Sequence, residues 1–251
     1  MARVKPTSFR SRRSTELRHL ASLLERYGVC LDTGPILSAA EQCSVNKPLG
    51  HDSWGYTIER LIFRNIEKPK NCWPKSISDL SIEFNIDISG WCLPKDHDQD
   101  PFETLAMDIL IRGRTAKGMH GVCAWHLDRH IGDHCERSVS PAHPHYHFQH
   151  GGNRLNDEIK DSGQALIIEA PRIAHPPLEA ALGIDFVLSN FKSNDWALIS
   201  QDSQYQKIVK ETQIHCWGSY IRAISTAFST HANDRKHDHQ LLSTELWPQL
   251  L

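Results

Sequence analysis

Apolar residues that recur at every second position constrain the fold of this chain more than any other sequence feature. In residues 82–88 the apolar positions are Ile82, Phe84, Ile86 and Ile88. In residues 105–112 they are Leu105, Met107, Ile109 and Ile111. Successive side chains of a β-strand point to opposite faces, so each stretch predicts a strand with one buried face. Strands of this kind are typical of an antiparallel sheet with one side packed against a core.

Two further alternating stretches, 122–130 and 143–150, lie in a tract that holds eight of the sixteen histidines. One face would carry the apolar and aromatic residues Cys123, Trp125, Leu127, Pro144, Tyr146 and Phe148. The other face would carry His126, Asp128, His130, His143, His145, His147 and Gln149. If the two strands pair antiparallel, His126, Asp128, His145 and His147 share the face opposite the core. Gly151 and Gly152 would end the second strand.

Helical spacing appears before and after these strands. Residues 14–27 place leucines at helical intervals, and residues 178–191 and 203–228 each show an apolar stripe. Residues 54–63 fit a strand or a helix equally well, and residues 165–170 suggest a short strand. The order predicts an α+β fold, with an N-terminal helix, an antiparallel β-meander and C-terminal helices packed on one sheet face.

We expect a single α+β domain over residues 1–251. Within it, residues 14–170 would supply the first helix and the sheet, and residues 171–228 the helical portion. Residues 1–13 and 229–251 are polar and are expected to be flexible.

Composition limits the class of protein. The chain is 39% hydrophobic and 23% charged, which is typical of a folded globular protein. A net charge of −2 gives no overall attraction to nucleic acid. Seven cysteines without a CxxC pair argue against a disulfide scaffold or a zinc ribbon. The sequence has neither a secretion signal nor an apolar run long enough to cross a bilayer, so we expect a cytoplasmic protein without a membrane partner.

The N-terminal stretch is locally basic. Residues 1–26 contain seven lysines and arginines against two glutamates. Arg10, Arg12 and Arg13 are therefore candidates for contacts with the phosphate backbone of a nucleic acid. The alternative is a solvated terminus followed by an ordinary charged helix face.

The histidine face permits three interpretations. Imidazoles and a carboxylate on adjacent strands can bind a divalent ion, with zinc as the first candidate, through His126, Asp128, His145 and His147. The same residues could instead act as a metal-free general acid and base on a ribose and its phosphodiester. The third interpretation is a solvated sheet face or a binding surface without catalysis.

A family resemblance involves the same residues. WHLDRH (125–130) followed by HPHYH (143–147) resembles the signature of TumE-type toxins of prokaryotic toxin–antitoxin systems. The matching positions are Trp125, Asp128, His130, Pro144, His145 and His147. Arg129 stands where that family tends to have asparagine. The resemblance implies a toxin- or antiphage-defence-type effector, RNA or DNA as its target and an antitoxin as its protein partner.

The order of elements is also similar to the fold of ubiquitin-conjugating enzymes, which have a His-Pro segment between the meander and the C-terminal helices. After His143-Pro144, however, the next cysteine is Cys216, in the middle of a predicted helix. A catalytic thioester is therefore not expected. Our leading expectation is cleavage of nucleic-acid phosphodiesters. The alternative is a non-enzymatic component of a prokaryotic defence system that binds a protein partner.

Overall fold

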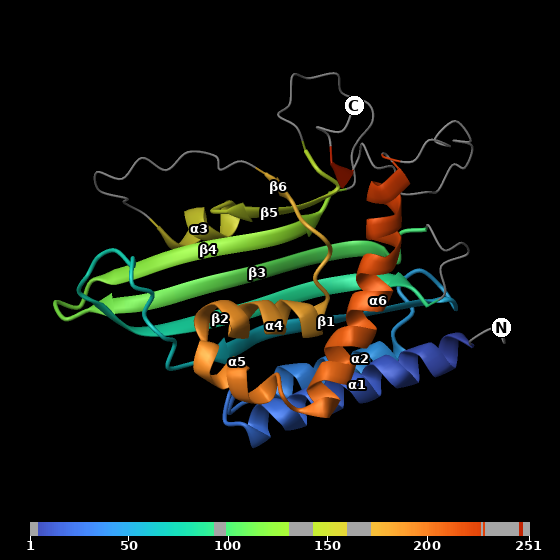
Figure 1. The fold of residues 1–251 in the computed structure, drawn as a ribbon, viewed down its shortest axis with the longest axis horizontal. Coiled ribbons are helices and arrows are strands. Elements are labelled where there is room, and N and C mark those ends of the chain that lie inside the picture. Colours follow the sequence, from blue (N-terminus) through green and yellow to red (C-terminus); the bar gives the residue numbers. More distant parts are fainter. Residues whose placement is uncertain are drawn as a thin grey trace.

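The computed structural model describes residues 5–92, 99–130, 143–159 and 172–226, together with residues 228, 246 and 247. Its strands form one sheet in the order β1-β2-β3-β4-β5-β6, and every neighbouring pair is antiparallel. Consecutive strands are therefore neighbours, which confirms the predicted meander (Figure 1). The strands are β1 (Ser53–Phe63), β2 (Ile77–Trp91), β3 (Phe102–Thr115), β4 (His120–Arg129), β5 (Tyr146–His150) and β6 (Ile173–Ala174).

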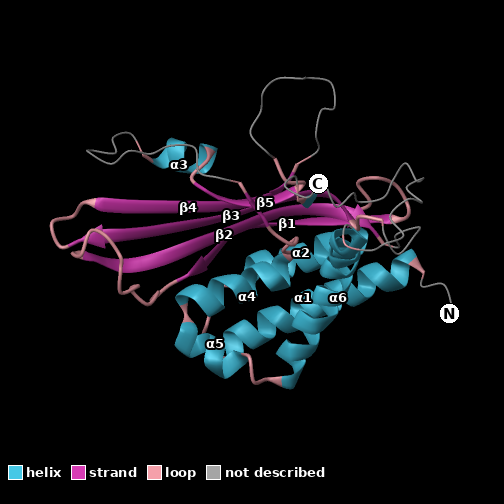
Figure 2. Cartoon of the chain, turned by 45° about the horizontal axis from the view of Figure 1, so that its top comes forward, coloured by secondary structure: helices cyan, strands magenta, loops and turns pink. Residues whose placement is uncertain are grey.

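The helices are α1 (Pro6–Arg26), α2 (Gly34–Val45), α3 (Asn153–Glu158), α4 (Ala180–Phe191), α5 (Ser193–Ile199) and α6 (Ser203–Thr226). In Figure 2 the helices α1, α2, α4, α5 and α6 lie on one side of the sheet, and the short α3 lies on the opposite side. This arrangement confirms the α+β class, with the N-terminal and C-terminal helices on the same sheet face. Helices α2, α3 and α5 were not predicted from the sequence.

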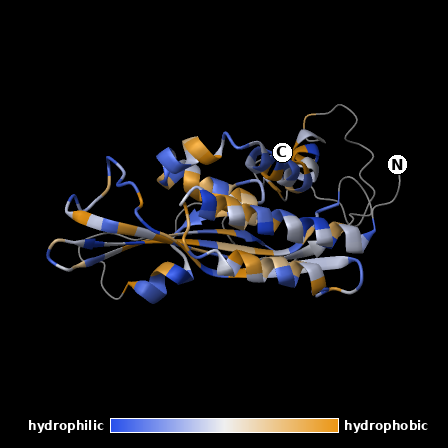
Figure 3. Ribbon diagram, turned by 90° about the horizontal axis from the view of Figure 1, so that it is seen from below, coloured by the Kyte–Doolittle hydropathy of each residue, from blue (hydrophilic) through white to orange (hydrophobic). Residues whose placement is uncertain are grey.

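The core lies between the sheet and this helical layer. Phe84, Met107 and Ile109 are fully buried, as their alternation predicts. A Cβ atom added to Gly183 of α4 would lie 2.8 Å from both the Phe84 ring and the Met107 sulfur. The glycine therefore allows the backbone of α4 to approach the sheet closely. Figure 3 shows the hydrophobic and hydrophilic bands along these helices that accompany one buried face.

The predicted flexible N-terminus is largely helical, which corrects the expectation for residues 6–13. Phe9 packs against Trp54 with ring centroids 5.8 Å apart. The Arg10 Nη1 atom donates to the backbone carbonyls of His51 at 2.8 Å and Ser53 at 2.9 Å. These contacts with the start of β1 hold the first turns of α1 in place, although their partners are distant in sequence.

Arg13 is also an interior residue and not a surface cation. Its guanidinium forms ion pairs with Glu16 at 2.6 Å and with Glu179 at 2.9 Å. Burial opposes the charged form, but these two carboxylates raise the pKa of Arg13 above its usual range. Tyr56 donates a short hydrogen bond to the same Glu179. The network therefore joins α1, β1 and the start of α4 inside the protein.

Several other expectations can be compared with the structure. Residues 54–63 are strand, within β1. The short strand expected over residues 165–170 lies outside the described residues, as does most of the expected flexible segment 229–251. No helix in the described part of the chain has the length and apolarity needed to span a membrane. The six cysteines in the described ranges are free thiols.

Candidate metal centre

The pairing of β4 with β5 determines which side chains meet. Asp128 is opposite His147, and Leu127 is opposite Phe148. Leu127 and Phe148 are buried towards the helical layer. Because neighbouring residues of a strand alternate, Asp128 and His147 project from the other face of the sheet. The predicted separation of aromatic and histidine faces is thus confirmed for these strands.

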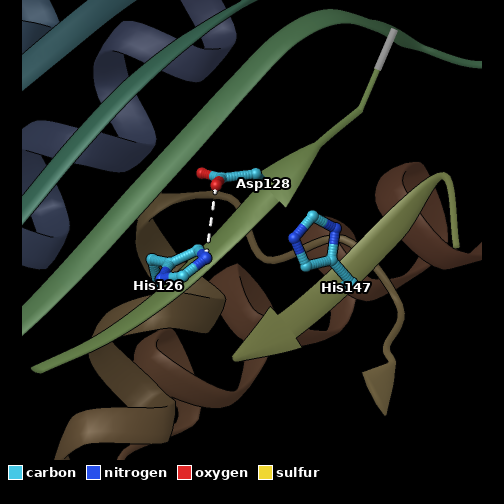
Figure 4. A group of neighbouring side chains, drawn as sticks. All are labelled: His126, Asp128 and His147. Atoms are coloured by element: carbon cyan, nitrogen blue, oxygen red, sulfur yellow. Dashed lines mark ion pairs between the residues drawn. The ribbon is translucent and has the colours of Figure 1, made fainter. Parts of the chain in front are cut away.

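Three side chains on that face converge. His126 and Asp128 come from β4 and His147 comes from β5 (Figure 4). Each offers one ligand atom, and these atoms lie within 4.8 Å of one another. The His126 Nε2 atom lies 3.6 Å from Asp128 Oδ2. Ligand atoms on a tetrahedral zinc ion are about 3.4 Å apart. Movements of roughly 1–1.5 Å would therefore bring all three onto one ion.

The environment of His147 suits a metal ligand. Its side chain is only 4% exposed, and its Nδ1 atom is buried without a hydrogen-bond partner in the described part of the chain. Unsatisfied buried nitrogens are uncommon in native proteins. Burial, together with the nearby His143, His126 and Arg172, lowers the pKa of His147 to about 4. The imidazole is therefore neutral at pH 7, which is the form that binds metal.

Carboxylates add negative charge to the cluster. Burial raises the pKa of Asp128 above its usual range; His126 opposes this shift and Asp108 adds to it. Asp108 of β3 is directly opposite His126 of β4. Burial also raises the pKa of Asp108. A bound cation would offset this unfavourable burial of negative charge.

The cluster opens into a cleft of about 1000 Å³. Arg154 and Arg172 line this cleft, as does Arg129, whose charge is paired with Asp100. The Arg154 Nη2 atom donates to Glu83 Oε1 at 3.0 Å. The sequence analysis did not identify Arg154 or Arg172 as cleft residues, because neither arginine lies in an alternating stretch. The only local signal was the position of Arg154 shortly after the Gly151-Gly152 pair.

Gly152 gives His126 the space that it occupies. Gly152 has φ +79°, and a Cβ atom there would lie 2.7 Å from His126 Cε1. Gly151 has φ +94°, but its Cβ would meet only Leu155, at 3.8 Å. The pair therefore ends β5, as predicted, and one of its two glycines also allows the close approach of a cluster residue.

His145 is not part of the cluster, which corrects its assignment as a ligand or catalytic group. Its Nε2 atom lies 3.1 Å from Asp100 Oδ2. The same carboxylate accepts hydrogen bonds from Tyr146 Oη at 2.6 Å and Arg129 Nε at 2.8 Å. The physical reason is that β5 begins at Tyr146, so the alternation does not extend back to residue 145.

The proposed phosphate contacts at the N-terminus are also revised. Arg10 and Arg13 are 2% and 4% exposed, and their guanidinium groups face protein partners. They are not available to an external phosphate. Arg12 is the only one of the three with a largely exposed side chain, at 58%. It lies in α1, on the helical side of the sheet, away from the cluster (Figure 2).

Comparison with known protein families, with curated proteins and with solved structures finds no match to this chain. The geometry of the cluster and its cleft therefore carries the functional argument.

Proposed function

We propose that this protein is a metal-dependent hydrolase of nucleic-acid phosphodiesters. His126, Asp128 and His147 would bind one divalent ion, with zinc as the first candidate. The observation that carries this proposal is the convergence of three ligand side chains in an open cleft. Structural zinc sites use four protein ligands, whereas catalytic sites use three and leave a position for water or substrate.

Four aspartates (Asp87, Asp108, Asp128 and Asp157) and three arginines line the cleft, so binding of an anionic substrate depends on the charge of the bound ion. Arg154 and Arg172 line the same cleft as the three ligands. The ion itself would add two positive charges and would neutralise part of the carboxylate charge of Asp108 and Asp128. A phosphate oxygen could then bind the ion directly.

The proposed reaction needs a nucleophile, and water bound to a divalent ion has a strongly lowered pKa. Its oxygen would form the new bond to phosphorus, and the bond to the leaving oxygen would break. A proton must reach that leaving oxygen. Solvent in the open cleft can supply this proton.

The biological setting that we propose is a toxin- or defence-type effector. Its support is the resemblance of residues 125–147 to TumE-type toxins. Among the positions that carry the resemblance, Asp128 and His147 belong to the cluster. Trp125 instead stacks on Phe148, with ring centroids 5.3 Å apart.

The first experiment tests the metal site. Protein purified without a histidine tag should retain about one equivalent of a divalent ion by elemental analysis. The His126→Ala/His147→Ala variant should retain none, because two ligands are lost together. His145→Ala is the matched control from the same tract and should retain the ion. Equal metal content in all three proteins would place the ion elsewhere.

The second experiment tests the reaction. Wild-type protein and Asp128→Asn should be incubated with single-stranded and double-stranded RNA and DNA, with added zinc, magnesium or manganese, or with chelator. We expect metal-dependent cleavage by the wild type and none by the variant. Cleavage that persists in chelator would favour metal-free histidine chemistry.

The same proteins can test the alternative function. If no condition gives cleavage, and Asp128→Asn loses a co-purifying protein, the surface is a partner-binding site and the hydrolase proposal is wrong. Expression of the wild type should also slow cell growth if the protein is a toxin, and Asp128→Asn should not.

A further inference from the structure

A second surface, which we call the distal tip, lies at one end of the sheet. It comprises residues 68–79, which lead into β2, and residues 113–120, which form the β3–β4 turn. Both segments lie at the left end of the sheet in Figure 1. The Ser78 Oγ atom donates to the Arg114 carbonyl at 3.1 Å. Ile77 fills the space beside Gly121: a Cβ atom added to Gly121 would lie 2.6 Å from the Cδ1 atom of Ile77. The two segments therefore form one continuous surface.

The distal tip is strongly basic although the whole chain has a net charge of −2. Its two segments contain five lysines and arginines and a single carboxylate, that of Asp79. All five cations are exposed: Lys68, Lys70, Lys75, Arg114 and Lys117. Within the described ranges none of them has a carboxylate within ion-pair distance. Their charges are therefore available to an anionic partner.

An exposed aromatic residue stands among these cations. Trp73 is 81% exposed, and Met119 of the neighbouring turn is 60% exposed. Such exposure of a tryptophan leaves a large apolar surface in water. Exposed aromatic rings beside lysines are the features that bind single-stranded nucleic acid, since bases stack on the ring while cations contact phosphates.

The distal tip is in line with the candidate metal centre. Arg114 is opposite His120, and Asp108 is opposite His126, in the same β3–β4 ladder. Arg114 and Asp108 are six residues apart on β3, an even number, so they project from the same face. At about 3.3 Å per residue, their separation along the strand is roughly 20 Å. Helix α3 packs on this face between the two points, with Leu155 against Leu110 and Ala124. A polymer bound at the tip would therefore pass beside α3 to reach the cluster.

We propose that the distal tip binds single-stranded RNA or DNA. The lysines and Arg114 contact phosphates, and Trp73 stacks on a base. The inference rests on the proposed function for its substrate class, but it assigns binding to residues that take no part in metal binding. Nucleic acid is favoured over a membrane because the exposed ring of Trp73 stands among cations, an arrangement that stacks a base and contacts its phosphates.

Binding can be measured without cleavage. A fluorescein-labelled, 15-nucleotide oligouridine is titrated with protein in chelator, and anisotropy is recorded at several salt concentrations. Each lysine–phosphate contact contributes about 0.7 to the slope of log affinity against log salt for a single strand. Lys70→Gln/Lys75→Gln should therefore lower that slope by about 1.4. Lys207→Gln/Lys210→Gln, which removes two exposed charges from α6 on the other side of the sheet, should leave it nearly unchanged.

Trp73→Ala tests the stacking contact. It should weaken oligouridine binding about tenfold, since base–aromatic stacking contributes roughly 1–3 kcal/mol per base. It should also remove most of the tryptophan fluorescence quenching that the oligonucleotide causes. Unchanged thermal unfolding would show that the exposed ring has no structural role.

Three outcomes would overturn the proposal: no binding by the wild type, equal losses in the tip variant and the α6 control, or unchanged binding by Trp73→Ala. Vesicles containing phosphatidylserine provide a competing probe. A fluorescence shift of Trp73 with vesicles and none with oligonucleotide would identify a membrane surface instead. If the wild type binds oligouridine but cleaves nothing, the hydrolase proposal fails and the distal tip remains a binding site.

Discussion

Replacing Gly152 with alanine should damage the metal centre although no ligand is replaced. The new Cβ would lie 2.7 Å from His126 Cε1, whereas ordinary contacts between such atoms are about 3.5 Å or longer. The imidazole must therefore retreat by about 0.8 Å. Metal–ligand distances tolerate deviations of only about 0.2 Å. We expect the affinity for zinc to fall about 10- to 100-fold, as it does when the support of a ligand is lost.

Gly151→Ala provides the matched control. Both glycines have positive φ, so alanine is strained at either position. At Gly152, where ψ is −171°, the backbone conformation is essentially restricted to glycine, and alanine costs about 1–3 kcal/mol. Only the substitution at Gly152 meets His126. Thermal unfolding in chelator should therefore show the larger loss of stability for Gly152→Ala, and calorimetric titration of the two folded variants with zinc should show the loss of affinity in Gly152→Ala alone. Equal zinc affinities would refute the placement of His126 in the cluster.

Three further predictions concern stability. Burial and nearby cations lower the pKa of His147 to about 4, and burial lowers the pKa of His215 to about 3. At pH 5 both imidazoles therefore stay neutral in the folded protein, whereas the same imidazoles in the unfolded chain take up protons. Stability in chelator should thus fall between pH 7 and pH 5 by about 2 kcal/mol per residue, and urea titration of His215→Phe should show about 2 kcal/mol less loss than wild type. Arg13→Ala should cost about 3–5 kcal/mol because it leaves Glu179 buried without its cation, and an unchanged melting temperature would contradict the buried pair. Gly183→Ala should cost about 1–3 kcal/mol in urea unfolding by overpacking α4 against the sheet, and no change would refute that close contact.

Period-two alternation predicted the sheet and most of the candidate site. It placed His126, Asp128 and His147 on one face because each lies inside a strand, where alternation is a geometric necessity. It placed His145 wrongly because strand boundaries are set by tertiary contacts, here the buried carboxylate of Asp100. That carboxylate is 45 residues away in sequence.

The interior arginines could not be predicted for a related reason. Arg10 and Arg13 have the composition of a solvated helix face, and their partners lie in β1 and before α4. Helix α2 was predictable in principle. Ile36, Ala39 and Cys43 recur at helical spacing and are buried, and Pro35 stands in the first turn. The helix was missed because alanine and cysteine in this stripe differ little in hydrophobicity from the residues around them.

The contacts of Arg13 also bear on how the protein is made. The guanidinium meets the hydroxyl of Thr212, which lies 199 residues further along the chain. At about 5–20 residues per second, roughly 10–40 s of synthesis separate the two. During that time Arg13 lacks Thr212, although α1 can already pack against α2 and the start of β1. The burial of Arg13 in a growing chain is therefore expected to be completed only after this part of α6 has left the ribosome.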